Sequence, residues 1–190
     1  GKTTLVDWLM AQKKYSTIIK KIISYTTRQP RKGERHGVDY YFIGDDEFKI
    51  KIDVNFFLEW TYVYGFYYGS SYEEVVSALS KGNSLIMIAD RYGIQQIIKK
   101  IHNVFIIYIT VPHKNALYER LYKRGTETEF FLKVRLEKSL QEMAQEEKSR
   151  IADFTIINSQ LSRSAECFEK IINEQLNQKN RYNVKSVKKV

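Results

Sequence analysis

Strand-like runs alternate with helix-like segments along this chain, and the alternation limits the possible folds more than any other feature. Residues 18–24, 85–89, 104–110 and 154–157 are short runs rich in β-branched or aromatic side chains, which is typical of strands. Helix-like segments lie between them, and this order is typical of a parallel sheet covered by helices. The sequence therefore predicts an α/β fold with a mainly parallel sheet.

Local signals set the ends of several predicted helices. Ser71 and Glu74 form a capping-box pattern that starts one helix, and Gly82 ends it. Thr126 and Glu129 form a second capping box that starts a long helix. The predicted helices cover residues 5–13, 46–51, 71–81, 93–101, 114–124, 126–150 and 164–175.

The segment between the first two long strand-like runs has a different character. Residues 25–35 are basic and rich in turn residues, so we expect a loop there. Residues 39–43 and 56–68 are strongly aromatic, and the second run alternates as a strand does. The sequence therefore predicts a small β-rich region in this part of the chain.

The composition agrees with a single domain that has a sizeable core. The chain has 190 residues, 43% of them hydrophobic, and its longest apolar runs are far too short to span a membrane. Cys167 is the only cysteine, so no internal disulfide can form, as is typical of proteins from reducing compartments. We therefore expect a cytoplasmic protein without a membrane-spanning segment.

The net charge of +9 is concentrated in two regions. The first precedes residue 36 and includes Lys2, Arg28, Arg31 and Arg35. A basic region of this kind suits phosphorylated small molecules as well as nucleic acids. The second region, residues 177–190, is predicted to be a solvated basic tail. We expect no nucleic-acid partner, but charge alone leaves that alternative open.

The chain opens with Gly1-Lys2-Thr3-Thr4, which matches the second half of the phosphate-binding loop Gly-x-x-x-x-Gly-Lys-Ser/Thr. In such a loop, backbone N–H groups surround phosphate oxygens, the lysine reaches the β- and γ-phosphates, and the hydroxyl ligates Mg²⁺. A helix that follows the loop adds the positive end of its dipole. On their own, four residues are more typical of a flexible terminus, so the rest of the chain decides.

Six later segments follow one another in a fixed order. They are residues 24–34 (SYTTRQPRKGE), 37–42 (GVDYYF), 57–60 (FLEW), 67–70 (YYGS), Asp90 with Gly93, and 124–129 (RGTETE). In order and spacing they resemble the guanylate kinase family over residues 1 to about 175. Six matches in register are specific, and they support the interpretation of Gly1-Lys2-Thr3 as part of a phosphate loop.

The resemblance implies phosphoryl transfer from ATP to GMP, giving ADP and GDP, with Mg²⁺. The residue chemistry agrees with this activity. The acceptor is already a phosphate anion, so the reaction needs no general base and rests on charge neutralisation and positioning. The first 36 residues supply the cations that such a reaction needs.

The resemblance also assigns the GMP site. Arg28 and Arg31 bind the GMP phosphate, because the planar guanidinium donates two hydrogen bonds to phosphate oxygens, which lysine cannot copy. Glu59 accepts hydrogen bonds from the N1–H and N2–H groups of guanine. The remaining GMP-binding residues are Ser24, Tyr40, Tyr68, Ser70 and Asp90. On pattern alone, each is also explained as a solvated loop charge, a packed ring or the polar side of a strand.

The ATP site is assigned in the same way. The phosphate loop contributes Gly1, Lys2, Thr3 and Thr4, with Thr3 as the metal ligand. Arg124 and Arg135 match arginines of a lid that reach the ATP phosphates, Arg120 supports the donor, and Asn158 approaches the adenine. Lys2, Arg28, Asp90, Arg124 and Arg135 are the predicted catalytic residues. A solvated helix face is the alternative for the three lid arginines.

The resemblance further implies an organisation of the chain. It predicts a P-loop kinase domain over residues 1–176, with a GMP-binding insertion at about 31–70 and a helical lid at about 113–145. Residues 177–190 form the basic tail. The oligomeric state is left open.

Several positions depart from the family's pattern. Ile88 and Tyr92 replace an acidic residue and a glutamine that the family usually carries on either side of Asp90. Asp90 is then a metal-side or an acceptor-side carboxylate. These departures keep a second class open, the guanylate-kinase-like domains that bind peptides and have lost turnover. The retained Lys2, Thr3 and Glu59, with both arginines and both tyrosines, favour the enzyme.

The sequence as given begins inside the phosphate loop, without the first glycine and the preceding strand. By resemblance that strand is central to the sheet, and buried backbone groups left unpaired cost roughly 1–3 kcal/mol each. We therefore expect these 190 residues alone to have little or no kinase activity.

Overall fold

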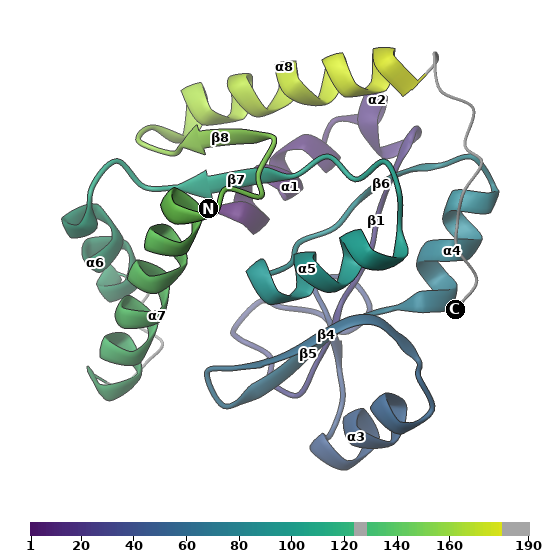
Figure 1. Cartoon of the computed structure of the whole chain (residues 1–190), viewed down its shortest axis with the longest axis horizontal. Helices are drawn as coiled ribbons and strands as arrows, with labels where there is room; N and C mark the ends of the chain where they lie inside the picture. Colours follow the sequence, from purple (N-terminus) through teal and green to yellow (C-terminus); the bar gives the residue numbers. More distant parts are fainter. Residues whose placement is uncertain (124–128, 180–190) are drawn as a thin grey trace. The chain divides into compact units, whose positions relative to one another are not determined.

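The computed structural model describes residues 1–123 and 129–179. The chain, whose helices and strands are labelled in Figure 1, divides into two units. One unit contains Gly1–Leu5 and Phe105–Asn177. The other contains Val6–Val104 together with Gln178 and Lys179. We call them the terminal unit and the central unit.

The central unit carries most of the strands. Its elements in chain order are α1 (Lys2–Met10, which begins in the terminal unit), α2 (Lys13–Ser16), β1 (Ile19–Lys21), β2 (Tyr25–Thr26), β3 (Tyr41–Phe42), α3 (Asp45–Asp53), β4 (Phe57–Val63), β5 (Phe66–Ser71), α4 (Tyr72–Ser80), β6 (Ser84–Ile86) and α5 (Arg91–Lys100). They form two sheets. β1 and β6 pair in parallel, and a four-stranded sheet has the order β3-β2-β5-β4.

The four-stranded sheet is mixed. β2 pairs with β3 in parallel and with β5 in antiparallel fashion, and β4 and β5 form an antiparallel hairpin. Tyr64 and Gly65 turn the hairpin, and both have positive φ angles (55° and 81°). Gly65 adopts such a φ at little cost, because it has no Cβ. β4 lies at one edge of this sheet, which matters for the site described below.

A hydrophobic cluster joins the helices of the central unit to its strands. Ile22, Leu58, Val75 and Ile97 are its buried members. Tyr72, Leu79, Leu85, Met87, Ala89, Ile101 and Val104 pack around them. A second group consists of stacked rings: Phe48 of α3 lies 4.4 Å from Phe57 and 5.1 Å from Tyr67, centroid to centroid. Burial of these apolar surfaces fixes α3, α4 and α5 against the strands.

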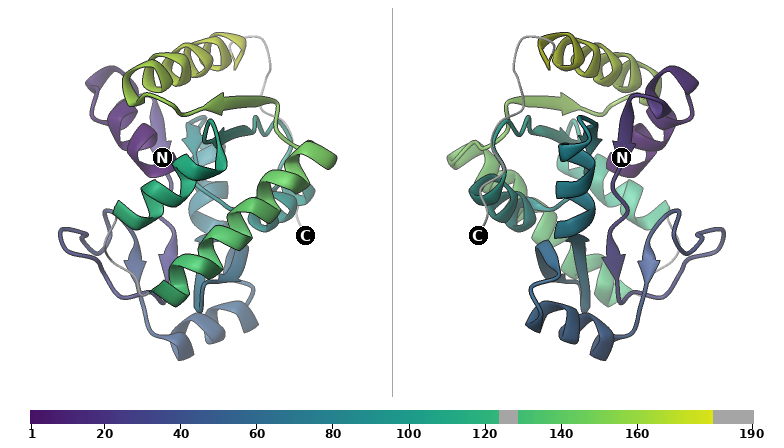
Figure 2. Two further views of the ribbon diagram at one scale, coloured as in Figure 1. Left: turned by 90° about the vertical axis from the view of Figure 1, so that its left-hand side faces the viewer. Right: turned by 90° about the vertical axis from the view of Figure 1, so that its right-hand side faces the viewer.

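The terminal unit holds the second parallel pair. Its elements are β7 (Ile107–Thr110), α6 (Lys114–Lys123), α7 (Glu129–Lys148), β8 (Phe154–Ile157) and α8 (Leu161–Lys179). β7 and β8 pair in parallel over four residues, and α8 runs along β8 (Figures 1 and 2). Ala165, Phe168 and Ile171 of α8 are buried, at the spacing of one helix face. α6 and α7 pack against each other (Figure 2).

The predicted alternation and the parallel pairings are confirmed, and the small β-rich region is present as the four-stranded sheet. Several boundaries were wrong. The first helix starts at Lys2 rather than at residue 5, the strands predicted at 18–24, 85–89 and 104–110 are shorter, and the predicted loop 25–35 contains β2. β2 exists because Tyr25 and Thr26 pair with residues about 40 positions away, which local propensity does not reveal. Among the described residues, no helix is long and apolar enough to cross a membrane.

Candidate active site

Two neighbouring strands of the four-stranded sheet carry three of the eight predicted GMP-binding residues. β4 contributes Glu59 and β5 contributes Tyr68 and Ser70, and Glu59 pairs with Ser70 across the hairpin. Side chains two residues apart on a strand point to the same face of the sheet. Tyr68 and Ser70 therefore share a face, as do Glu59 and Thr61, and the sheet itself brings these side chains together.

A hydrogen-bonded chain of three side chains forms one end of the site, which we call the base end. The Ser70 hydroxyl donates to Glu59 Oε1 at 2.7 Å, and the Ser24 and Ser70 hydroxyl oxygens lie 3.2 Å apart. Because Ser70 directs its hydrogen at Glu59, the Ser24 hydroxyl is the donor in the second contact. Glu59 and Ser70 are almost completely buried. All three residues were predicted from the sequence to lie in one site.

Asp90 lies beside the hydrogen-bonded side chains of the base end. Its Oδ1 accepts from the Gly93 backbone N–H at 2.8 Å and caps α5, and its Oδ2 accepts from the Thr61 hydroxyl at 3.0 Å. The pKa of Glu59 is raised to about 7, chiefly by burial and also by the charge of Asp90, while the Ser70 hydrogen bond and Lys100 act in the opposite direction. Glu59 is therefore a buried acceptor that changes its charge near neutral pH.

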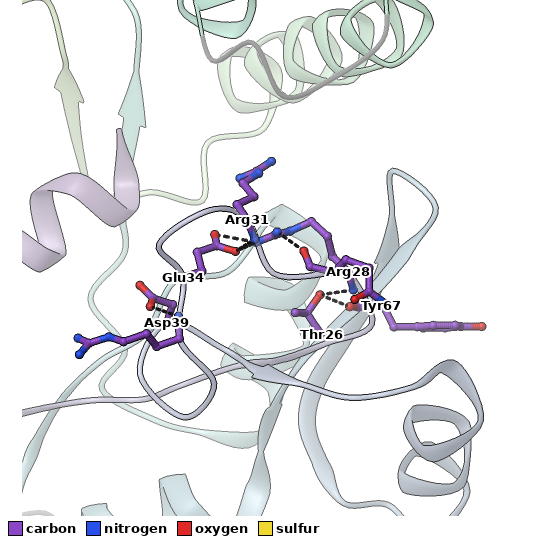
Figure 3. A network of polar contacts seen from close by, with 8 residues as sticks. Thr26, Arg28, Arg31, Glu34, Asp39 and Tyr67 are labelled. Carbon is purple, nitrogen blue, oxygen red and sulfur yellow. Dashed lines mark hydrogen bonds and ion pairs between the residues drawn. The ribbon is translucent and has the colours of Figure 1, made fainter.

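The other end, which we call the phosphate end, is built around Arg28 (Figure 3). Arg28 Nη2 donates to both oxygens of Glu34 at 2.9 Å, and Nη1 donates to the Gln29 carbonyl at 2.6 Å. Glu34 Oε2 also accepts from the backbone N–H of Arg31 at 2.7 Å. Burial lowers the pKa of Arg28, but its bonds to Glu34 and Tyr68 outweigh this and raise the pKa overall. The guanidinium is thus held, charged, at a fixed place.

Two tyrosines complete the phosphate end. The Arg28 guanidinium lies 5.6 Å from the ring centre of Tyr40, and the Tyr40 and Tyr68 rings lie 6.0 Å apart. Burial raises the pKa of Tyr40, and the positive charges of Arg28 and Arg31 lower it, which places both arginines within electrostatic reach of this hydroxyl. The structure therefore brings Arg28, Arg31, Tyr40 and Tyr68 together. The Arg31 side chain points away from the Glu34 carboxylate (Figure 3).

The described residues among those predicted to bind ATP belong to the terminal unit. Lys2, Thr3 and Thr4 are exposed in the first turn of α1. A Cβ added to Gly1 would lie 2.5 Å from Asn158 Nδ2, so Gly1 approaches this buried amide closely. Arg120 Nη2 donates to the Ser159 carbonyl at 3.2 Å, next to Asn158. Gly1, Asn158 and Arg120 thus lie around the ends of β7 and β8.

The remaining predicted residues have separate outcomes. Arg135 lies on α7 and is partly buried, and Arg124 lies outside the described residues. Within residues 1–123 and 129–179, no group of three or more His, Cys, Asp or Glu side chains could hold a metal ion. The proposed metal ligand Thr3 presents its hydroxyl at the exposed start of α1.

Sequence reasoning missed four polar residues that contact the predicted ones or the backbone next to them. Glu34 follows Arg31 by three residues, so its place in the motif was the available signal. Thr61 lies two residues after Glu59, and strand alternation could have indicated it. Gln96 and Lys100 contact the backbone on either side of Glu59 from 36 and 42 residues away, and nothing local indicates them.

Comparison with known proteins agrees with this geometry. The family model for guanylate kinase matches residues 1–175. The guanylate kinases of Chlamydia muridarum and Cupriavidus metallidurans are both 40% identical to this chain, over 85% and 83% of it and over 76% and 70% of their own lengths. The crystal structure of guanylate kinase from Anaplasma phagocytophilum superposes with a TM-score of 0.71 at 26% identity, covering 91% of this chain and 81% of that one. The chain therefore belongs to the guanylate kinase family.

Proposed function

We propose that this chain transfers the γ-phosphoryl group of ATP to GMP, giving ADP and GDP. The observation that carries this proposal is the presence of two buried groups in one unit: the Glu59 carboxylate with hydroxyl neighbours, and the Arg28 guanidinium, just after β2, beside Tyr40 and within electrostatic reach of Tyr68. A nucleoside monophosphate has matching ends, a base with hydrogen-bond donors and a phosphate dianion. Membership of the family makes GMP the acceptor.

At the base end, Glu59 reads guanine. Guanine presents N1–H and N2–H side by side, and one carboxylate accepts both. Adenine has no such pair of donors, so its binding would leave a buried acceptor unpaired. Sites that require a hydrogen bond discriminate by about 10⁴-fold or more for this reason. Ser24 and Ser70 hold Glu59 in place through the chain of contacts at 3.2 and 2.7 Å.

At the phosphate end, Arg28 and Arg31 bind the GMP phosphate, and the Tyr40 and Tyr68 hydroxyls hydrogen-bond it. Charge-assisted bonds of this kind are the strong ones in proteins. Glu34 accepts hydrogen bonds from Nη2 of Arg28. This contact fixes the orientation of the guanidinium and so determines which of its other N–H groups face the ligand. We infer that Asp90 acts on the acceptor side, because it lies next to Glu59 and Thr61.

The donor side is formed by Gly1, Lys2, Thr3 and Thr4, with Arg120, Arg124, Arg135 and Asn158. Mg²⁺ would be held by the Thr3 hydroxyl together with phosphate oxygens and water, which fits an ion that binds through few protein ligands. When bound, it would neutralise charge on the ATP phosphates. Lys2 and the arginines bind and orient the phosphates, and the GMP phosphate oxygen needs no base to attack. The lid at about 113–145 and the GMP-binding insertion at about 31–70 belong to this proposal, and the cytoplasmic location stays a prediction.

A coupled assay of ADP formation tests the function. The chain, extended upstream by a strand and a Gly-x-x-x-x segment, is given Mg-ATP with GMP, AMP, CMP or dTMP at equal concentrations. The proposal requires faster ADP release with GMP than with any other acceptor. GMP binding without ADP formation would indicate a domain that has lost turnover, and equal rates with all four acceptors would contradict the proposal.

A further inference from the structure

β4 is an edge strand, and two side chains of α5 occupy its outer edge. The Gln96 amide donates to the Trp60 carbonyl at 2.7 Å and accepts from the Trp60 N–H at 3.2 Å, as a neighbouring strand would. Lys100 Nζ donates to the Leu58 carbonyl at 2.7 Å. Gln96 and Lys100 are four residues apart and therefore lie on one face of α5. The helix thus holds the backbone of β4 on both sides of Glu59.

The strand is irregular at this point. Phe57 pairs with Ser71 and Glu59 pairs with Ser70, so β4 has one extra residue, Leu58, opposite the β5 strand. Such a bulge bends a strand and redirects a side chain. Leu58 is fully buried, and a buried carbonyl needs a donor, which Lys100 provides. Lys100 therefore stabilises the bulge directly before Glu59.

α5 also contacts the Glu59 side chain itself. A Cβ added to Gly93, in the first turn of α5, would lie 2.5 Å from Glu59 Oε2. Ser70 holds the other oxygen, Oε1, from β5. The charged groups that act on Glu59 are Asp90, which precedes α5, and Lys100 at the end of α5. Helix α5 and its cap therefore act on the Glu59 carboxylate in three ways. Gln96 and Lys100 hold the neighbouring backbone, Gly93 leaves room for Oε2, and Asp90 and Lys100 act on its charge.

We propose that Lys100 and Gln96 are positioning residues that fix the base-reading carboxylate of Glu59 and thereby set the preference for guanine. They act through the backbone carbonyls of Leu58 and Trp60 and touch no ligand. This inference rests on the proposed function, because it assumes that Glu59 reads the base. Its consequence is that base preference depends on two residues outside the family motifs that predicted the site.

The test measures equilibrium binding of GMP and AMP by calorimetry. Lys100→Met keeps the apolar stem and removes the donor and the charge. Lys99→Met is its matched control, since Lys99 is exposed on the same helix and carries the same charge. We expect Lys100→Met to lower the ratio of GMP to AMP affinity by about tenfold, the size of one charge-assisted hydrogen bond, and Lys99→Met to leave the ratio unchanged.

A pH profile and a conservative variant separate positioning from general damage to the fold. Without the Lys100 charge, the pH at which the GMP preference reaches half its maximum should rise. Lys100→Arg, which keeps the charge and the donors, should restore the wild-type ratio and midpoint. Gln96→Glu has the same shape but no amide donor for the Trp60 carbonyl, so it should also lower the ratio of GMP to AMP affinity. This variant tests the inference if Lys100→Met does not fold.

The outcomes distinguish this inference from the proposed function. If the wild-type chain binds GMP no better than AMP, both are wrong. If the wild-type chain prefers GMP while folded Lys100→Met and Gln96→Glu keep the ratio and midpoint of Lys99→Met, the proposed function stands and the positioning role is wrong. A lower ratio in both variants with rescue by Lys100→Arg supports the inference.

Discussion

Two glutamates lie at the two ends of the candidate acceptor site, and they differ in their partners. Glu34 accepts two hydrogen bonds from the Arg28 guanidinium and one from a backbone N–H. Glu59 accepts from the neutral Ser70 hydroxyl and lies near a second carboxylate, Asp90. The first carboxylate has its cation within the protein, whereas burial raises the pKa of the second to about 7. The comparison teaches that Glu34 orients a protein group, while Glu59 is left to accept donors from a ligand.

The largest effect is expected from Glu59→Gln. Gln replaces one acceptor by a donor that faces a guanine donor, so the preference for GMP should collapse. We expect the ratio of kcat/KM for GMP over AMP to fall on the order of 10³-fold, most of the discrimination that such a site supplies. Melting curves should show a folded protein. An unchanged ratio would mean that Glu59 is only a strand residue.

Arg28→Lys should weaken the binding of GMP and of AMP by the same factor, because both nucleotides carry the same phosphate group. Lys keeps the charge but loses the planar guanidinium, and bonds to charged groups contribute about 1.5–3 kcal/mol, or roughly 10- to 100-fold in affinity. Calorimetric titration of each nucleotide into the variant measures this. Arg31→Lys should act in the same direction. A changed ratio of GMP to AMP affinity in either variant would contradict the claim that the phosphate end does not contribute to base preference.

The pH dependence of base preference tests the charge of Glu59. Its pKa of about 7 means that the carboxylate is mostly neutral at pH 6 and mostly ionised at pH 8. Only the anion accepts two hydrogen bonds from guanine, so the ratio of GMP to AMP affinity should rise about tenfold over this range. The ratio cancels the titration of the shared phosphate. A flat ratio would show that Glu59 does not titrate there.

The same titration affects folding with a defined sign. The pKa of Glu59 in the folded chain lies above its ordinary value of 4.5, so between pH 4.5 and 7 the folded chain binds more protons than the unfolded chain. The stability contributed by the neutral carboxyl is present below pH 4.5 and is lost as the pH rises through 7. Urea unfolding at pH 5 and pH 8 should therefore show that wild type loses stability relative to Glu59→Gln at the higher pH.

Glu34→Gln should have the smallest effect. Gln keeps one acceptor for Arg28 but loses the charge, so GMP affinity should fall by about tenfold, the lower end of the range for a hydrogen bond to a charged group. Asp39→Asn is the control, because Asp39 Oδ2 accepts from the Arg35 N–H in the same loop and has no contact with Arg28 in Figure 3. Titration of GMP into both variants measures the two losses of affinity. Equal losses in both variants would indicate loop stability rather than orientation of Arg28.

The sequence predicted what depends on local pattern and on motif. The capping box of Ser71 and Glu74 needs only four residues, and Ser71 accepts the Glu74 N–H as expected. Glu59, Ser24 and Ser70 were predicted together from motifs, and the structure joins them by hydrogen bonds. Lys100 could not be predicted, because its role depends on a bulge at Leu58 and on the packing of α5 against an edge strand. Such features arise only when distant segments meet.

Equilibrium binding of GMP and AMP to the unmodified chain, at pH 8 and without ATP, tests the central claim most directly. The two nucleotides share the ribose and the phosphate, so the difference in affinity reports the base end alone. If Glu59 reads guanine, GMP binds at least about 100-fold more tightly than AMP. Equal affinities for GMP and AMP would contradict the account.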